Sequence, residues 1–143
     1  MNKKRLVAPV MLLFVLCLLA SSALAAPYEP GKIAYSHVKE LSEHSRVAGT
    51  PGEVEAKEYI YKEFKAMGYK PTFQRFTFKT YNRAYSSANV IAVKPGQSSK
   101  VVIVGAHYDS APEGKGADDN ASGVAVMLEA AKMLKDEQTP YTI

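Results

Sequence analysis

One histidine and three aspartates in the second half of the chain have the types and spacing of a metal site: His107, Asp109, Asp118 and Asp119. Imidazole nitrogens and carboxylate oxygens are both zinc ligands. Asp109 lies two residues after His107, so in an extended chain it can lie on the same side and accept a hydrogen bond from the imidazole nitrogen that faces away from a metal. A carboxylate of Asp118 or Asp119 could bridge two cations. This spacing predicts metal-dependent chemistry.

Each of the two motifs also has a simpler explanation when it is taken alone. A His-x-Asp sequence is often only a hydrogen-bonded pair, and two aspartates before a helix often compensate the positive end of the helix dipole. The two motifs together favour a metal, because they lie twelve residues apart after one apolar strand. Three carboxylates and an imidazole gathered at one strand end are costly to bury unless a cation compensates them.

The elements on either side of these residues are expected to position them. The run 101–104, Val-Val-Ile-Val, has no polar residue and predicts a strand buried on both faces. His107 would then lie at the carboxyl edge of the sheet, where open α/β sheets bind ligands. A helix is expected over 123–135, and five residues are expected on its apolar face: Val126, Met127, Ala130, Ala131 and Leu134.

Residues 32–68 are expected to form two helices. One is expected near 32–44. The second begins with Thr50 as N-cap and Pro51 at the first helical position, with Glu53 placed to close a capping box. Its apolar residues recur at helical spacing and Gly68 ends it. His37 and His44 are expected at the surface rather than as metal ligands.

Three further strands are expected from the apolar and aromatic pattern. The first covers 72–80, where Phe76 and Phe78 share a face and Phe73 is out of phase, which suggests a bulge or a later start. A loop is expected over 82–87, and strands 89–94 and 100–104 are expected to form a hairpin around 95–99. Alternating strands and helices predict an α/β fold, a three-layer sandwich with a mixed central sheet flanked by helices.

The first 25 residues have the pattern of a signal peptide. A basic start is followed by the uncharged apolar run 6–19 and by the small residues Ser22 to Ala25. A membrane anchor is the alternative, but a span needs about 20 apolar residues. We therefore expect cleavage after Ala25, secretion of residues 26–143, and no stable membrane anchor afterwards.

The composition excludes some classes of partner. The whole chain has a net charge of +4, and removal of Lys3, Lys4 and Arg5 leaves +1. This charge does not indicate a nucleic-acid surface. The only cysteine is Cys17, inside the expected signal peptide, so no disulfide is expected in the mature chain.

Two stretches closely resemble the secreted two-zinc (co-catalytic) metallo-aminopeptidases of the aminopeptidase Y or leucyl aminopeptidase type. They are 101–110, Val-Val-Ile-Val-Gly-Ala-His-Tyr-Asp-Ser, and 116–123, Gly-Ala-Asp-Asp-Asn-Ala-Ser-Gly. The stretch 46–52 and the sequence Met67-Gly68-Tyr69 resemble the same enzymes. The resemblance implies that residues 26–143 are the N-terminal portion of a zinc aminopeptidase domain.

The resemblance also implies a role for individual residues. His107 is a ligand of one zinc, Asp119 bridges both zincs (counting back from Ser122-Gly123), and Asp109 supports His107 from behind. The peptide bond after Asp119 is expected to be cis. Tyr108 is expected to pack, although it could shape a substrate cleft.

The activity implied is release of residues from peptides with a free N-terminus, by a zinc-activated water. In this family the general-base glutamate belongs to a Glu-Glu pair at the end of the next strand. Residues 139–143 look like the first residues of that strand. We therefore expect this base beyond Ile143, no catalytic residue within the chain, and an inactive N-terminal fragment. The alternatives are a single-zinc glutaminyl cyclase-like transferase and a non-catalytic interaction module on the same fold.

Overall fold

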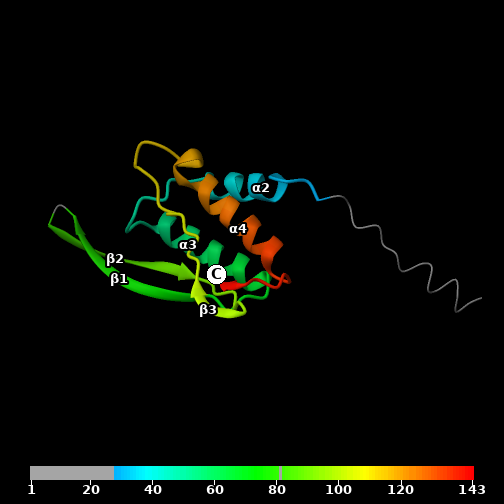
Figure 1. Cartoon of the computed structure of the whole chain (residues 1–143). Helices are drawn as coiled ribbons and strands as arrows, with labels where there is room; N and C mark the ends of the chain where they lie inside the picture. The colour runs from blue at the N-terminus through cyan, green and yellow to red at the C-terminus, as the bar shows by residue number, and fades with distance from the viewer. Residues whose placement is uncertain (1–27, 81) are drawn as a thin grey trace, which may run out of the picture.

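The computed structural model describes residues 28–80 and 82–143, and the expected signal peptide lies outside them. Their elements in chain order are α2 (Lys32–Leu41), α3 (Pro51–Ala66), β1 (Thr72–Thr80), β2 (Arg83–Ile91), β3 (Ser98–Val101), a turn of π-helix η2 (Ala117–Ala121), α4 (Ser122–Leu134) and β4 (Tyr141–Thr142). Figure 1 shows α2 beside α4, with α3 between these two helices and the long β1–β2 hairpin. The α/β class is confirmed. No described helix is both long and apolar enough to cross a membrane.

Helix α3 begins as the sequence predicts, but without a capping box. Thr50 has the extended backbone of an N-cap and Pro51 is the first helical residue. The side chain of Glu53 turns away from the Thr50 amide and accepts hydrogen bonds from the Gly49 amide and the Ser87 hydroxyl. Glu53 is buried, so it links the start of the helix to β2. Gly68, with φ of 88°, follows the helix end in the left-handed conformation that glycine tolerates best.

Helix α2 is held at its start by a residue distant in sequence and at its end by a nearby arginine. The buried carboxylate of Glu129 on α4 accepts hydrogen bonds from the amides of Gly31 and Ala34 and from the Tyr28 hydroxyl. A carboxylate there satisfies amides that the first turn leaves free. At the other end the helix stops at Leu41, three residues before the expected end, and the Arg46 guanidinium donates to the Leu41 carbonyl.

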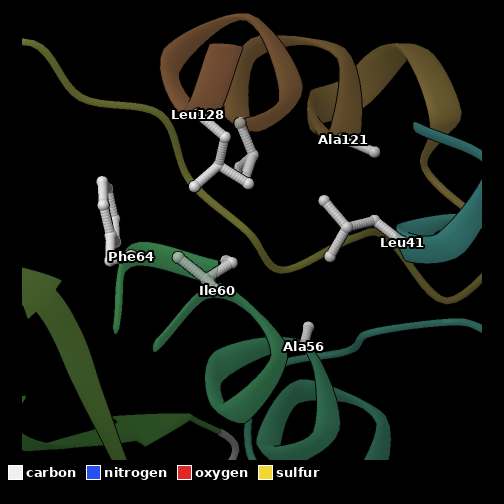
Figure 2. Close-up of a cluster of buried hydrophobic side chains, with 7 residues drawn as sticks. Leu41, Ala56, Ile60, Phe64, Ala121 and Leu128 are labelled. Carbon is white, nitrogen blue, oxygen red and sulfur yellow. The ribbon is translucent and has the colours of Figure 1, made fainter. Parts of the chain in front are cut away.

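The core lies where α3 and α4 face each other. Figure 2 shows Ile60 and Phe64 of α3 opposite Leu128 of α4. The complete cluster is Leu41, Ala56, Ile60, Phe64, Ala121, Val124 and Leu128. Burial of each large side chain contributes about 1.5–3 kcal/mol. The predicted apolar face of α4 is correct in part. Met127 and Ala131 pack against the core cluster, but Val126 is 62% exposed and the fully buried residues are Val124, Ala125 and Leu128.

The β1–β2 hairpin replaces a predicted loop. Strand β1 has the predicted bounds, but residues 83–87, expected in a loop, form the first half of β2. The register runs unbroken from Thr72 opposite Ile91 to Thr80 opposite Arg83, so no bulge is present. Phe73 stacks on Tyr61 of α3, whereas Phe78 stacks on Tyr85. The polar residues 83–87 join the strand because its backbone pairing needs no apolar side chain.

The predicted hairpin between 89–94 and 100–104 is wrong. Ile143 exchanges two backbone hydrogen bonds with Lys94, and β4 pairs in parallel with β3. Residues 141–143 therefore lie between the two segments, and the described strands form one antiparallel and one parallel pair. Burial of 101–104 on both faces is also wrong: these residues are 44–89% exposed, because no described strand pairs with 103 or 104.

His37 is buried, contrary to the surface position expected from the sequence. It is 5% exposed, because α2 packs on α4 and the imidazole contacts the ring of Tyr59 on α3. Its Nδ1 atom lies 2.6 Å from the Tyr59 hydroxyl, and Nε2 has no hydrogen-bond partner among the described residues. Burial lowers the pKa of His37, and the nearby charges of Glu63, Lys132 and Glu129 have smaller effects.

We predict that acidification destabilises the chain through His37. In the unfolded chain this imidazole takes up a proton near pH 6.5, whereas the folded chain binds it only at lower pH. The stabilisation is therefore complete above about pH 6.5 and is lost as the pH falls through the folded pKa. The urea midpoint of the parent should fall between pH 8 and pH 5.5 by more than that of a His37→Gln variant. His44→Gln, at an exposed position, is the control and should behave as the parent. Equal losses in the parent and His37→Gln would contradict the prediction.

Candidate metal centre

His107 contacts a different aspartate through each of its ring nitrogens. Nε2 lies 2.9 Å from Oδ1 of Asp119, and Nδ1 lies 3.1 Å from Oδ1 of Asp109. The structure thus brings together three of the four residues that the sequence singled out. Asp118 has no contact with His107 among the described hydrogen bonds and ion pairs. The imidazole is half exposed and the Asp119 side chain is 80% exposed, so the group is open to solvent.

The turn η2 presents Asp119 to the imidazole. Asp119 and Asn120 depart from helical backbone angles inside this turn, and the Asp119–Asn120 peptide bond is cis, as the resemblance implied. The Asn120 side chain accepts a hydrogen bond from the Gly123 amide at the start of α4. A Cβ at position 123 would lie 2.3 Å from the Asn120 side-chain oxygen, which is why glycine occupies this position.

Arg46 joins the two segments that carry the site. Its guanidinium donates to the carbonyl oxygens of Tyr108, Lys115 and Gly116, at 2.7, 2.7 and 2.8 Å. The first of these carbonyls follows His107 and the other two precede η2. One buried side chain, 2% exposed, therefore fixes the distance between the histidine and the turn that holds Asp119.

The backbone around Arg46 strengthens the same connection. The Arg46 amide donates to the Ser110 hydroxyl at 2.9 Å, and the Ser110 amide donates to the Arg46 carbonyl at 3.2 Å. Burial lowers the pKa of the Arg46 guanidinium, and the charge of Asp109 opposes that shift. In the sequence, Arg46 stands out only as part of the stretch 46–52 that resembles the zinc aminopeptidases. The small residues Val47, Ala48 and Gly49 after Arg46 could have indicated that this arginine is buried.

Tyr108 anchors the histidine segment to the hairpin. Its hydroxyl donates to the Ala88 carbonyl of β2 and lies 3.3 Å from the Glu53 carboxylate of α3. Burial raises the pKa of the Tyr108 phenol, so the group keeps the proton that it donates. The packing role expected for this tyrosine is confirmed, because the ring lies against the core cluster.

The donor set suits zinc but is incomplete. Zinc binds imidazole nitrogen and carboxylate oxygen, and a catalytic zinc usually has three protein ligands. His107 and Asp119 supply one donor of each kind on the same side of the imidazole. Within 28–80 and 82–143, no group of three or more side chains is placed to hold one ion. The arrangement therefore offers two of the donors that a zinc site would need.

Comparison with known proteins identifies the same region. Residues 89–143 match the family described as Peptidase family M28. The alkaline phosphatase isozyme conversion protein of Escherichia coli strain K12 is 30% identical over 144 residues, which cover 83% of this chain and 42% of the relative. Aminopeptidase YwaD of Bacillus subtilis strain 168 is 49% identical over 53 residues, covering 35% and 12%.

Two solved structures share the fold. A glutaminyl cyclase from Fimbriiglobus ruber has a TM-score of 0.73 at 27% identity, and the match covers 81% of this chain and 43% of that one. A Zn-dependent exopeptidase from Parabacteroides distasonis has a TM-score of 0.72 at 27% identity, covering 83% and 46%. The chain spans less than half the length of each of these four proteins.

We predict that Arg46→Lys loosens the segment between His107 and Asp119. An ammonium cannot reach the same set of carbonyls, and buried acceptors left unpaired cost about 1–3 kcal/mol. Urea unfolding should show a loss of this size, and hydrogen exchange should rise most in 105–117. Arg83→Lys, at an exposed position of β2, is the matched control and should leave both measurements unchanged. Equal effects of the two substitutions would contradict this role.

Proposed function

We propose that this chain, whose residues 89–143 match Peptidase family M28, supplies the zinc half-site of an exported aminopeptidase. The observation that carries the proposal is the paired contact of His107, with Asp119 on one ring nitrogen and Asp109 on the other. All three residues lie in the stretch that matches the family. The substrates proposed are peptides with a free N-terminus, from which single residues are released outside the cell.

Each residue has a defined task in this proposal. Nε2 of His107 and the carboxylate of Asp119 would hold zinc, with Asp119 shared between two ions. Asp109 accepts the proton of Nδ1, which fixes the tautomer and leaves the Nε2 lone pair free. Bound zinc polarises a carbonyl and lowers the pKa of a water. Arg46 keeps the two donors at a constant separation.

We propose that the described residues alone are not an active enzyme. Two donors fall short of the three that a catalytic zinc usually has, and no glutamate stands among the groups that contact His107. A general base must reach the attacking water directly or through one further water. The remaining ligands and the base would have to come from residues other than those of 28–80 and 82–143.

A glutaminyl cyclase-like transferase is the second candidate. The structural match to the Fimbriiglobus ruber cyclase equals the match to the exopeptidase, so the fold supports both. The similarity to aminopeptidase YwaD over 53 residues favours the peptidase. A non-catalytic interaction module is less well supported, because the metal residues His107, Asp109 and Asp119 are all present.

We predict that the full chain, without a histidine tag, binds zinc through His107 and Asp119. Isothermal titration with zinc should show weak binding, because only two donors are present, and His107→Ala and Asp119→Ala should abolish it. Asp109→Ala should weaken binding about 10–100-fold, because it removes the group that orients the imidazole. His44→Ala is the control at an exposed histidine, and circular dichroism checks that each variant is folded. Zinc binding that survives His107→Ala would contradict the proposed site.

We predict that the site works when it is placed in a complete enzyme. The stretch of this chain that matches YwaD should replace those 53 residues and retain zinc-dependent hydrolysis of leucyl-p-nitroanilide. His107→Ala in this graft should reduce hydrolysis to the zinc-free rate, and the full chain alone should show none.

The reciprocal graft distinguishes the two candidates. The corresponding stretch placed in the Fimbriiglobus ruber cyclase is assayed for ammonia release from an N-terminal glutaminyl peptide. The peptidase proposal expects the larger retained fraction of parental activity in YwaD. A larger fraction in the cyclase would favour the transferase, and turnover by the full chain alone would contradict the proposed half-site.

A further inference from the structure

A buried carboxylate on α3 contacts the segment that carries His107. Glu53 is 3% exposed, and no described lysine, arginine or histidine forms an ion pair with it. Its Oε2 atom accepts a hydrogen bond from the Gly49 amide, whereas Oε1 accepts one from the Ser87 hydroxyl and lies 3.3 Å from the Tyr108 hydroxyl. A buried carboxylate without a cation is costly unless hydrogen bonds satisfy it. These contacts therefore determine where the Glu53 side chain lies.

The contacts of Glu53 reach across the chain instead of along the helix. In a capping box, the glutamate at the third helical position accepts a hydrogen bond from the N-cap amide. Here the Thr50 amide donates to the Val47 carbonyl instead, at 3.0 Å. The carboxylate is thus free to bind Ser87, 34 residues away on β2, and to contact Tyr108, 55 residues away. One side chain therefore connects α3, β2 and the segment of the candidate donors.

The direction of the Tyr108 side chain sets the direction of its neighbours. Successive side chains of an extended segment point to opposite sides. Tyr108 packs against the core cluster, whereas the side chains of His107 and Asp109 are 52% and 46% exposed. Apolar contacts of the ring are non-directional. The hydroxyl is directional, because it donates to the Ala88 carbonyl and lies beside Glu53, and it therefore fixes the depth and rotation of the ring.

We propose that Glu53 is a positioning residue for the zinc donors and that it acts through Tyr108. Its carboxylate and the Ala88 carbonyl together fix the Tyr108 hydroxyl, so His107 keeps the orientation in which Asp119 lies at Nε2. Loss of this support would leave both donors in the chain but turn the imidazole away from the position in which both can reach one ion. This role rests on the proposed zinc site, although it can be measured without zinc.

Two residues elsewhere in the fold distinguish positioning from ordinary structural support. Glu129 is also a buried helical carboxylate, 5% exposed, and it accepts three hydrogen bonds from the start of α2 and the residues before it. Tyr69 resembles Tyr108, because its hydroxyl donates to the Ala131 carbonyl at 2.8 Å and its ring packs against the core cluster. Neither control residue forms a described hydrogen bond with residues 105–110. Their substitution should lower stability without changing the orientation of the imidazole.

The metal-free test follows the histidine rings by NMR. The chain has three histidines, so labelling with carbon-13 histidine gives three sets of ring signals, which variants lacking one histidine each assign. In the full chain at pH 8, Tyr108→Phe and Glu53→Ala should displace the His107 signals. Tyr69→Phe and Glu129→Ala should leave these signals in place, although they lower the urea midpoint. Tyr108→Phe removes a single oxygen atom, so it carries the test if Glu53→Ala does not fold.

Zinc binding by isothermal titration supplies the second measurement. Tyr108→Phe and Glu53→Ala should each weaken binding about 10-fold, as loss of a group that supports a ligand does. The double variant should bind no more weakly than the weaker single variant, because both substitutions remove one pathway of support. Additive losses would overturn action through Tyr108.

The metal-free signals decide the positioning role by themselves. His107 signals that stay in place in either folded variant, or that Tyr69→Phe and Glu129→Ala displace equally, would overturn it. A parent chain that binds no zinc would overturn the proposed zinc site instead, and the ring signals would still decide whether Glu53 orients His107.

Discussion

The buried guanidinium of Arg46 gathers carbonyl oxygens from the end of α2, from Tyr108 and from the loop before η2. A guanidinium has five donors in a rigid fork, so it can hold several backbone segments at once without a paired carboxylate. Those segments would otherwise be open loops with buried polar groups. The contact between His107 and Asp119 depends on this arrangement, because neither side chain is held by burial of its own.

The candidate donors follow an exposed apolar segment. Residues 101–104 are 44–89% exposed and lead directly to His107. The position of the imidazole therefore depends on the hydrogen bonds of Arg46 and on the contacts of Tyr108 with α3 and β2, rather than on burial of the segment before it.

Features that depend on residues close together in the sequence, such as helix ends and the spacing of candidate ligands, could be predicted. Thr50, Pro51 and Gly68 predict the ends of α3, because capping residues act on the adjacent helical turn. The short spacing between His107 and the pair Asp118-Asp119 indicated a common site, and the family resemblance selected Asp119, which contacts the imidazole. Predictions failed where the partner is distant. A loop was predicted over 82–87 because these residues lack an apolar pattern, but residues 83–87 form backbone hydrogen bonds with β1 that do not depend on apolar side chains. Residues 101–104 were predicted to be buried because all four are apolar. The apolar pattern does not indicate whether a neighbouring strand covers them, and in the structure they are exposed.

The α/β class, the candidate donor residues and the resemblance of their stretch to the zinc aminopeptidases could be predicted from the sequence, because side-chain chemistry and short spacings are properties of the chain. The burial of His37 and the role of Arg46 in joining the two segments of the candidate site were visible only in the tertiary structure. The tertiary structure also decided that Ile143 lies between 89–94 and β3. These outcomes depend on which segments pack together, and a buried polar group finds its partner only when distant parts of the chain meet.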